Sequence, residues 1–128
     1  MNILLIDDDP LTLEFLRKGL ESNGHIVTTA ENGFNALCLL EDHRFDSIIC
    51  DIFMPQISGL VVANIVSHYY GSAVPLLLMS SNKNIGQFIR TQLKPGYDFI
   101  QKPVSIPDLV FWINQKKGGG QYVLNNPN

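Results

Sequence analysis

The chain has 128 residues, of which 45% are hydrophobic and 16% charged, and its net charge at pH 7 is −3. This length fits one domain of ~100–150 residues, and the composition provides a core and excludes a disordered chain. The largest basic cluster is the pair Lys116–Lys117, so we expect no nucleic-acid-binding surface. No apolar stretch approaches the ~20 residues of a membrane span, and the N-terminus lacks the basic region of a signal peptide.

The chain has two cysteines, Cys38 and Cys50, and three scattered histidines. Neither set has the spacing of a disulfide framework or of a zinc site. Both cysteines lie in apolar runs, which predicts small core residues in a reduced, cytoplasmic protein.

Short apolar runs alternate with segments of helical period from the N-terminus to Lys117. Runs this short, bounded by turn-forming residues, are typical of strands that are buried on both faces of a parallel sheet. The predicted strands are, in chain order, Ile3–Ile6, Ile26–Thr29, Ser47–Cys50, Pro75–Met79 and Tyr97–Ile100. The five helices after them carry Leu13, Leu16 and Leu20; Ala36, Leu37 and Leu40; Leu60, Ala63 and Val66; Ile85, Phe88, Ile89 and Leu93; and Leu109, Val110 and Ile113. This alternation predicts an α/β fold, a doubly wound five-stranded parallel sheet with helices on both faces.

Turn and capping signals give the limits of these elements. Asn23-Gly24 and Lys94-Pro95-Gly96 are expected to end the first and fourth helices, and Ser105 is expected to cap the last one. Three glycines and a polar stretch follow Lys117. We therefore expect residues 1–117 to form the domain and residues 118–128 to form a flexible tail or the start of a linker.

Polar residues follow the predicted strands at the edge where an open parallel sheet binds its ligands. They are Asp7, Asp8 and Asp9 after the first strand, Asp51 after the third, Ser80 after the fourth and Lys102 after the fifth. Carboxylates that converge in one crevice repel each other unless a cation lies between them, and Mg²⁺ prefers a few hard oxygen ligands. A lysine and a hydroxyl opposite such a metal can hold a phosphoryl group during its transfer. Each residue alone would be an ordinary turn or cap residue, whereas the joint pattern predicts a phosphoryl-transfer site.

These motifs resemble the receiver domain of two-component response regulators, the CheY-like family, over about residues 1–117. The resemblance depends on an ordered set: Ile-Asp-Asp-Asp-Pro (6–10), Asn-Gly (32–33), Cys-Asp-Ile-Phe-Met-Pro (50–55), Ser-Gly (58–59), Val-Pro-Leu-Leu-Leu-Met-Ser-Ser (74–81) and Phe-Ile-Gln-Lys-Pro (99–103). It implies a (βα)5 sheet of the flavodoxin-like, CheY-like kind.

The resemblance also implies a phosphoacceptor and a metal site. Asp51 matches the acceptor, whose carboxylate takes a phosphoryl group from a phosphohistidine to give an aspartyl phosphate. Asp8 matches the direct Mg²⁺ ligand, and Asp7 matches the residue that holds a metal-bound water. Asp51 itself and the backbone carbonyl of Phe53 would complete the protein's share of the coordination shell.

Three further positions match groups that bind the phosphoryl group or respond to it. Lys102 would bind one phosphoryl oxygen, the Ser80 hydroxyl would turn towards another, and Phe99 would move with that hydroxyl. Phe53 is bulky where many relatives carry a small or polar residue, so we expect it to shield the phosphoryl group from water. Asn82 is polar, and we expect it to offset part of that shielding by orienting a water.

The implied function is a phosphorylation-activated switch of a two-component phosphorelay in the cytoplasm, not a metabolic enzyme. A histidine kinase or a phosphotransfer protein would be the donor. Family precedent places an effector or a second copy on the face formed by the fourth helix, the fifth strand and the last helix. In the last helix, Val110, Phe111 and Trp112 together are more than one buried stripe can hold. The sequence leaves open whether the chain stands alone or is the N-terminal receiver of a longer regulator.

Two other classes remain as alternatives at this point. A Mg²⁺-dependent phosphohydrolase also uses an aspartate nucleophile, although such enzymes usually carry a second acid two residues later, where this chain has Phe53. A flavodoxin-like cofactor binder would need a phosphate-cradling loop after the first strand. The aspartates at positions 7–9 would instead repel a phosphate group.

Overall fold

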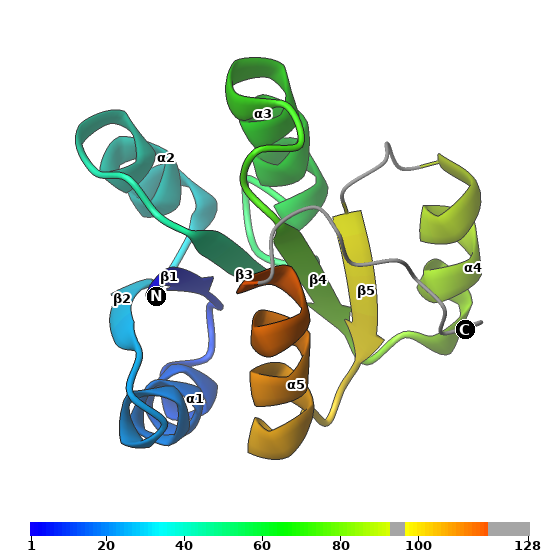
Figure 1. The fold of residues 1–128 in the computed structure, drawn as a ribbon. Helices are drawn as coiled ribbons and strands as arrows, with labels where there is room; N and C mark the ends of the chain where they lie inside the picture. Colours follow the sequence, from blue (N-terminus) through cyan, green and yellow to red (C-terminus); the bar gives the residue numbers. More distant parts are fainter. Residues whose placement is uncertain (93–96, 118–128) are drawn as a thin grey trace.

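The computed structural model describes residues 1–92 and 97–117. Five parallel strands form one sheet in the order β2-β1-β3-β4-β5 (Figure 1). The elements are β1 (Asn2–Ile6), α1 (Pro10–Ser22), β2 (Ile26–Ala30), α2 (Gly33–Asp42), β3 (Ser47–Asp51), α3 (Gly59–Tyr70), β4 (Leu76–Ser80), α4 (Lys83–Gln92), β5 (Tyr97–Gln101) and α5 (Ile106–Lys117). The predicted fold is confirmed, while the stop signal at 94–96 and the tail at 118–128 lie outside the described residues.

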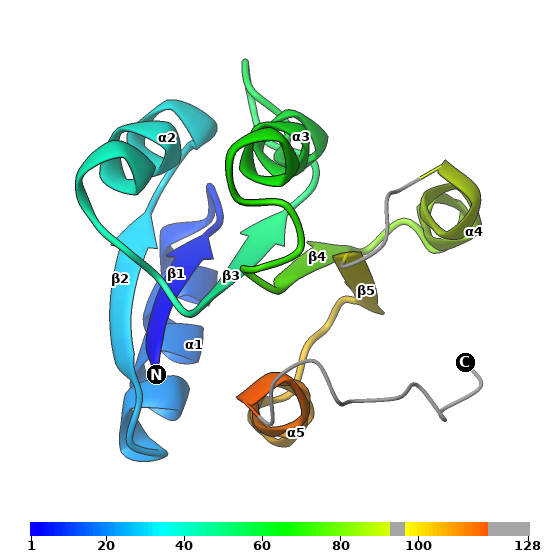
Figure 2. The ribbon, with the colours of Figure 1, turned by 45° about the horizontal axis from the view of Figure 1, so that its top comes forward.

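The helices cover the sheet on both faces. Figure 2 shows α1 and α5 on one face and α2, α3 and α4 on the other. Two core clusters follow from the alternation of side chains along the strands. Leu4, Ile48 and Leu76 pack towards α2, α3 and α4, whereas Ile3 and Ile49 pack towards α1 and α5. No helix within the described ranges is both long enough and apolar enough to cross a bilayer.

The central strands are buried along their whole length. Every residue of β3 and β4 is buried, which explains why both read as continuous apolar runs. Cys50 is one of these core residues, as predicted. The same prediction is wrong for Cys38, which is exposed on α2. The buried stripe of α2 contains Ala36 and Leu40, and a residue two positions from each points to the opposite side of the helix.

The strand register brings the carboxyl ends of β1, β3 and β4 to the same edge. Ile6 pairs with Cys50, and Asp51 pairs with Met79. The chain leaves β1 for β2 on one side and later returns to β3 on the other side. The crevice between the ends of β1 and β3 is therefore the point where connections diverge, which is where such sheets bind ligands.

Candidate functional site

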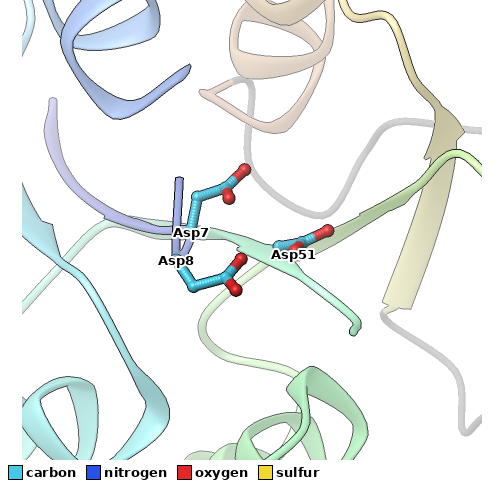
Figure 3. A group of neighbouring side chains, drawn as sticks. All are labelled: Asp7, Asp8 and Asp51. Atoms are coloured by element: carbon cyan, nitrogen blue, oxygen red, sulfur yellow. The ribbon is translucent and has the colours of Figure 1, made fainter. Parts of the chain in front are cut away.

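Three carboxylates converge at the crevice between β1 and β3. Asp7 and Asp8 follow the last residue of β1, and Asp51 is the last residue of β3 (Figure 3). One carboxylate oxygen from each of the three lies within 4.8 Å of the others. Asp7 and Asp51 are buried and Asp8 is exposed, so the cluster opens to solvent on one side.

The third residue of the acidic run has a different role. Asp9 caps α1, because its side chain accepts hydrogen bonds from the Leu11 N–H at 3.2 Å and from the Thr12 hydroxyl at 2.6 Å. Its own N–H donates to Asp7 Oδ1 at 3.0 Å, which helps to orient that buried carboxylate. Two of the three consecutive aspartates therefore belong to the cluster, and the third begins the helix.

Lys102 contacts both buried carboxylates. Its Nζ donates to Asp7 Oδ2 at 2.9 Å and lies 3.1 Å from Asp51 Oδ1. The end of β5 places it there, because the Lys102 N–H donates to the Ser80 carbonyl at 2.9 Å. Burial disfavours the ammonium charge, but the hydrogen bonds and charges of Asp7 and Asp51 outweigh burial and raise the pKa of Lys102. Lys102 therefore stays positively charged at neutral pH.

The single positive charge of Lys102 does not fully compensate the negative charge of the three carboxylates. Burial, followed by the charge of Asp7, raises the pKa of Asp51 to about 6, although Lys102 opposes the rise and Asp8 adds to it. An ordinary aspartate has a pKa near 3.8, so the protein holds the Asp51 carboxylate at an electrostatic cost. A divalent cation among the three carboxylates would remove that cost, and the oxygen ligands fit Mg²⁺.

Ser80 lies at the same edge, at the end of β4, and is buried. Its hydroxyl oxygen accepts a hydrogen bond from the Asn82 N–H at 3.0 Å. The Asn82 side-chain oxygen accepts the Asn84 N–H at 2.9 Å, so this side chain caps α4. The expectation that Asn82 orients a water stays a prediction, and the structure adds that its side-chain oxygen accepts the capping hydrogen bond. The sequence signal for the cap is an asparagine just before the helix.

The loop after β3 approaches the cluster closely. A Cβ atom at Gly59 would lie 2.2 Å from the carbonyl oxygen of Asp51, so only glycine lets α3 begin against the end of β3. Within the loop, Gln56 has a φ of 69°, and the Ile57 N–H donates to the Pro55 carbonyl at 2.8 Å in a tight turn. The Phe53 side chain is 55% exposed.

Phe111 and Trp112, the α5 residues predicted for a partner surface, point in different directions. The Trp112 indole N–H donates to Asp98 Oδ2 at 2.7 Å, so this side chain faces β5. Phe111 is exposed and lines a shallow hollow with Asn23 at the end of α1. Adjacent helical residues point about 100° apart, so Phe111 and Trp112 face different neighbours, and a partner contact on this face stays a prediction.

An apolar hollow of about 440 Å³ adjoins Lys102 between α1 and the start of the β5–α5 connection. Its lining residues are Leu11, Thr12, Phe15, Leu16, Met79, Ser81, Lys102, Pro103 and Val104. Leu11 is 80% exposed beside this hollow, and Phe15 is also exposed. Sequence reasoning missed this surface, because its residues come from three separate segments.

Comparison with known sequences identifies relatives of this chain. The family model described as the response regulator receiver domain matches residues 3–114. The chain is 29% identical over 110 residues to Response regulator MprA of Mycobacterium sp. (strain KMS), a match that covers 86% of this chain and 47% of that protein. MprA of Mycobacterium avium (strain 104) is also 29% identical, with 86% and 48% covered. The chain spans about half the length of the curated relatives it matches.

Solved structures show the same fold. The receiver domain of a signal transduction histidine kinase from Syntrophus aciditrophicus has a TM-score of 0.82 at 25% identity, covering 95% of this chain and 93% of that chain. Response regulator TrrA from Thermotoga maritima, in complex with Mg²⁺-BeF, has a TM-score of 0.78 at 28% identity, covering 89% and 96%. The resemblance inferred from the motifs is confirmed: the chain belongs to the response regulator receiver domain family of two-component signalling proteins.

Proposed function

We propose that this receiver domain is a phosphorylation-activated switch in which the Asp51 carboxylate accepts the phosphoryl group. The observation that carries the proposal is the arrangement at one sheet edge, where Lys102 contacts Asp51 and Asp7 beside the exposed Asp8. The domain would promote its own phosphorylation and dephosphorylation, and it would not act as a metabolic enzyme.

The donor would be a phosphohistidine on a histidine kinase or on a phosphotransfer protein. An Asp51 carboxylate oxygen attacks the phosphorus, the phosphorus–nitrogen bond breaks, and the electron pair of that bond stays on the imidazole nitrogen. An aspartyl phosphate results. Because the Lys102 Nζ already lies 3.1 Å from Asp51 Oδ1, it would bind a phosphoryl oxygen and neutralise the charge there.

Mg²⁺ is the proposed cofactor. Asp8 and Asp51 would bind it directly, Asp7 would hold a metal-bound water, and the Phe53 carbonyl would complete the protein's share. Bound Mg²⁺ would neutralise the negative charge of the phosphoryl oxygens. The three carboxylates within 4.8 Å and the raised pKa of Asp51 support a divalent cation at this place, and the Thermotoga relative holds Mg²⁺-BeF.

The hollow beside Lys102 would receive the donor protein. Leu11 and Phe15 expose apolar surface there, and a partner bound over them would bring its phosphohistidine to the crevice. An effector or a second copy would bind on the face formed by α4, β5 and α5. A cytoplasmic location fits the unpaired thiols of Cys38 and Cys50.

Intact-mass measurement after incubation with Mg²⁺ and acetyl phosphate tests the proposal. We expect the wild type to gain the mass of one phosphoryl group and Asp51→Asn to gain none. Asp9→Asn is the matched control, because asparagine also caps a helix and Asp9 lies outside the carboxylate cluster. Phosphorylation of Asp51→Asn would refute the assignment. Continuous release of phosphate from phosphate esters would instead support the phosphohydrolase alternative.

A further inference from the structure

The ring of Phe99 lies against the backbone of α4 at Gly86. A Cβ atom at Gly86 would lie 2.9 Å from Cε2 and 3.2 Å from Cδ2 of that ring, closer than side-chain atoms normally approach. Gly86 is in the interior of α4, where glycine is unfavourable relative to alanine because it loses more backbone entropy. The glycine weakens the helix and provides the space that the ring occupies.

The start of the same helix holds the Ser80 hydroxyl. Ser80 Oγ accepts the Asn82 N–H at 3.0 Å, and the Asn82 side chain caps the helix through the Asn84 N–H. The Asn82 carbonyl also accepts the Ile85 N–H at 3.3 Å. Asn82 and Gly86 are four residues apart, about one helical turn, so the beginning of α4 contacts both Ser80 and Phe99.

We propose that Gly86 is a positioning residue that seats Phe99 on α4 in the unphosphorylated domain and thereby sets how readily the switch responds. This inference rests on the proposed function. When Ser80 Oγ turns towards a phosphoryl group on Asp51, the Asn82 N–H loses its acceptor. The start of α4 then changes together with the ring that is seated on it.

A methyl group at position 86 would exclude the ring from this seat, so it should destabilise the unphosphorylated arrangement selectively. A change that destabilises one of two states shifts the equilibrium towards the other state. We therefore expect Gly86→Ala to favour the activated arrangement. The same change should leave the metal site intact, because the three atoms nearest to an added Cβ all belong to the Phe99 ring.

The experiment compares Gly86→Ala in the wild type and in Phe99→Ala by calorimetric titration with BeF₃⁻ at saturating Mg²⁺. In the wild type, we expect Gly86→Ala to lower the BeF₃⁻ concentration at half-saturation by roughly threefold or more, as for coupled neighbouring residues. Mg²⁺ affinity without BeF₃⁻ should be unchanged. In Phe99→Ala, the ring is absent, so Gly86→Ala should leave the BeF₃⁻ half-saturation unchanged.

Urea unfolding of the same four proteins provides the second measurement. Gly86→Ala should stabilise Phe99→Ala through helix propensity, and it should not stabilise the wild type, where the methyl meets the ring. An unchanged BeF₃⁻ midpoint in Gly86→Ala, with a normal wild-type response, would overturn this inference alone. Equal effects of Gly86→Ala in both backgrounds would also overturn it. A wild type that takes no BeF₃⁻ would overturn the proposed function itself.

Discussion

Asp51→Asn should stabilise the metal-free domain at neutral pH, because it removes a carboxylate that the fold holds at an electrostatic cost. Burial and the charge of Asp7 raise the pKa of Asp51 to about 6, against 3.8 for an ordinary aspartate. Below pH 3.8 the carboxyl is protonated in both the folded and the unfolded chain, so it causes no difference. Between pH 3.8 and about 6 the unfolded chain releases this proton while the folded chain keeps it, so the folded state loses stability across that range.

The size of the effect follows from the two pKa values. The difference between 3.8 and about 6 corresponds to a penalty of about 3 kcal/mol once the pH exceeds the folded pKa. At about pH 4 the same two values leave a penalty below ~1 kcal/mol. Asparagine keeps the shape of the side chain without its charge. We expect Asp51→Asn to gain up to ~3 kcal/mol at about pH 7.5 and little at about pH 4.

Urea unfolding in the presence of a chelator, across this pH range, measures the effect. Asp9→Asn serves as the control, because that exposed acid has its pKa lowered, chiefly by the Thr12 hydroxyl, and its removal should give no gain at neutral pH. Added Mg²⁺ should stabilise the wild type more than Asp51→Asn, since ligand binding stabilises the state that binds it. A gain of equal size at both pH extremes, or no gain at neutral pH, would refute the electrostatic reasoning.

Three further predictions concern the metal, the lifetime of the phosphoryl group and the fold. Asp8→Ala should weaken Mg²⁺ binding in a calorimetric titration more than Asp7→Ala, and equal losses would contradict direct coordination by Asp8. Phe53→Asn should speed loss of the phosphoryl group roughly fivefold, a change of about 1 kcal/mol in the barrier, by admitting a water; equal decay rates would exclude that shielding. Gly59→Ala should lower the free energy of unfolding by ~2 kcal/mol or more, because its methyl would overlap the Asp51 carbonyl, and a wild-type value would contradict that contact.

The sequence was sufficient to predict the sheet and the acidic site because both depend on the strands. Parallel strands bring their carboxyl ends to one edge, so Lys102 meets Asp7 across 95 residues of chain. Each strand differs from its predicted range by one residue at one or both ends, and the difference at the start of β4 has a physical reason. The predicted strand begins at Pro75, whereas β4 begins at Leu76, because proline has no N–H to donate to a neighbouring strand. The Pro75 carbonyl still accepts the Ile48 N–H at 3.0 Å.

What could not be predicted depends on side-chain directions and loop contacts. The pattern in α5 indicates an excess of apolar residues, but it does not indicate that Trp112 turns to Asp98 while Phe111 turns towards α1. Similarly, the sequence shows only that Asn82 lies two residues after Ser80. Whether its side chain faces the crevice or caps α4 depends on the loop between them.

The central strands are more deeply buried than the edge of the sheet, and this difference explains how phosphorylation of Asp51 could alter a distant surface. Asp7 follows β1 and Asp51 ends β3, and both strands are central and buried, so the proposed phosphoryl acceptor and metal ligands are held rigidly. β5 is an edge strand of intermediate burial, and α4 lies beside it (Figure 1). Segments with fewer buried contacts rearrange at lower free-energy cost than the core does. A new hydrogen bond to Ser80 would therefore shift α4 and β5. The strands β1 and β3 would stay in place and keep the site assembled.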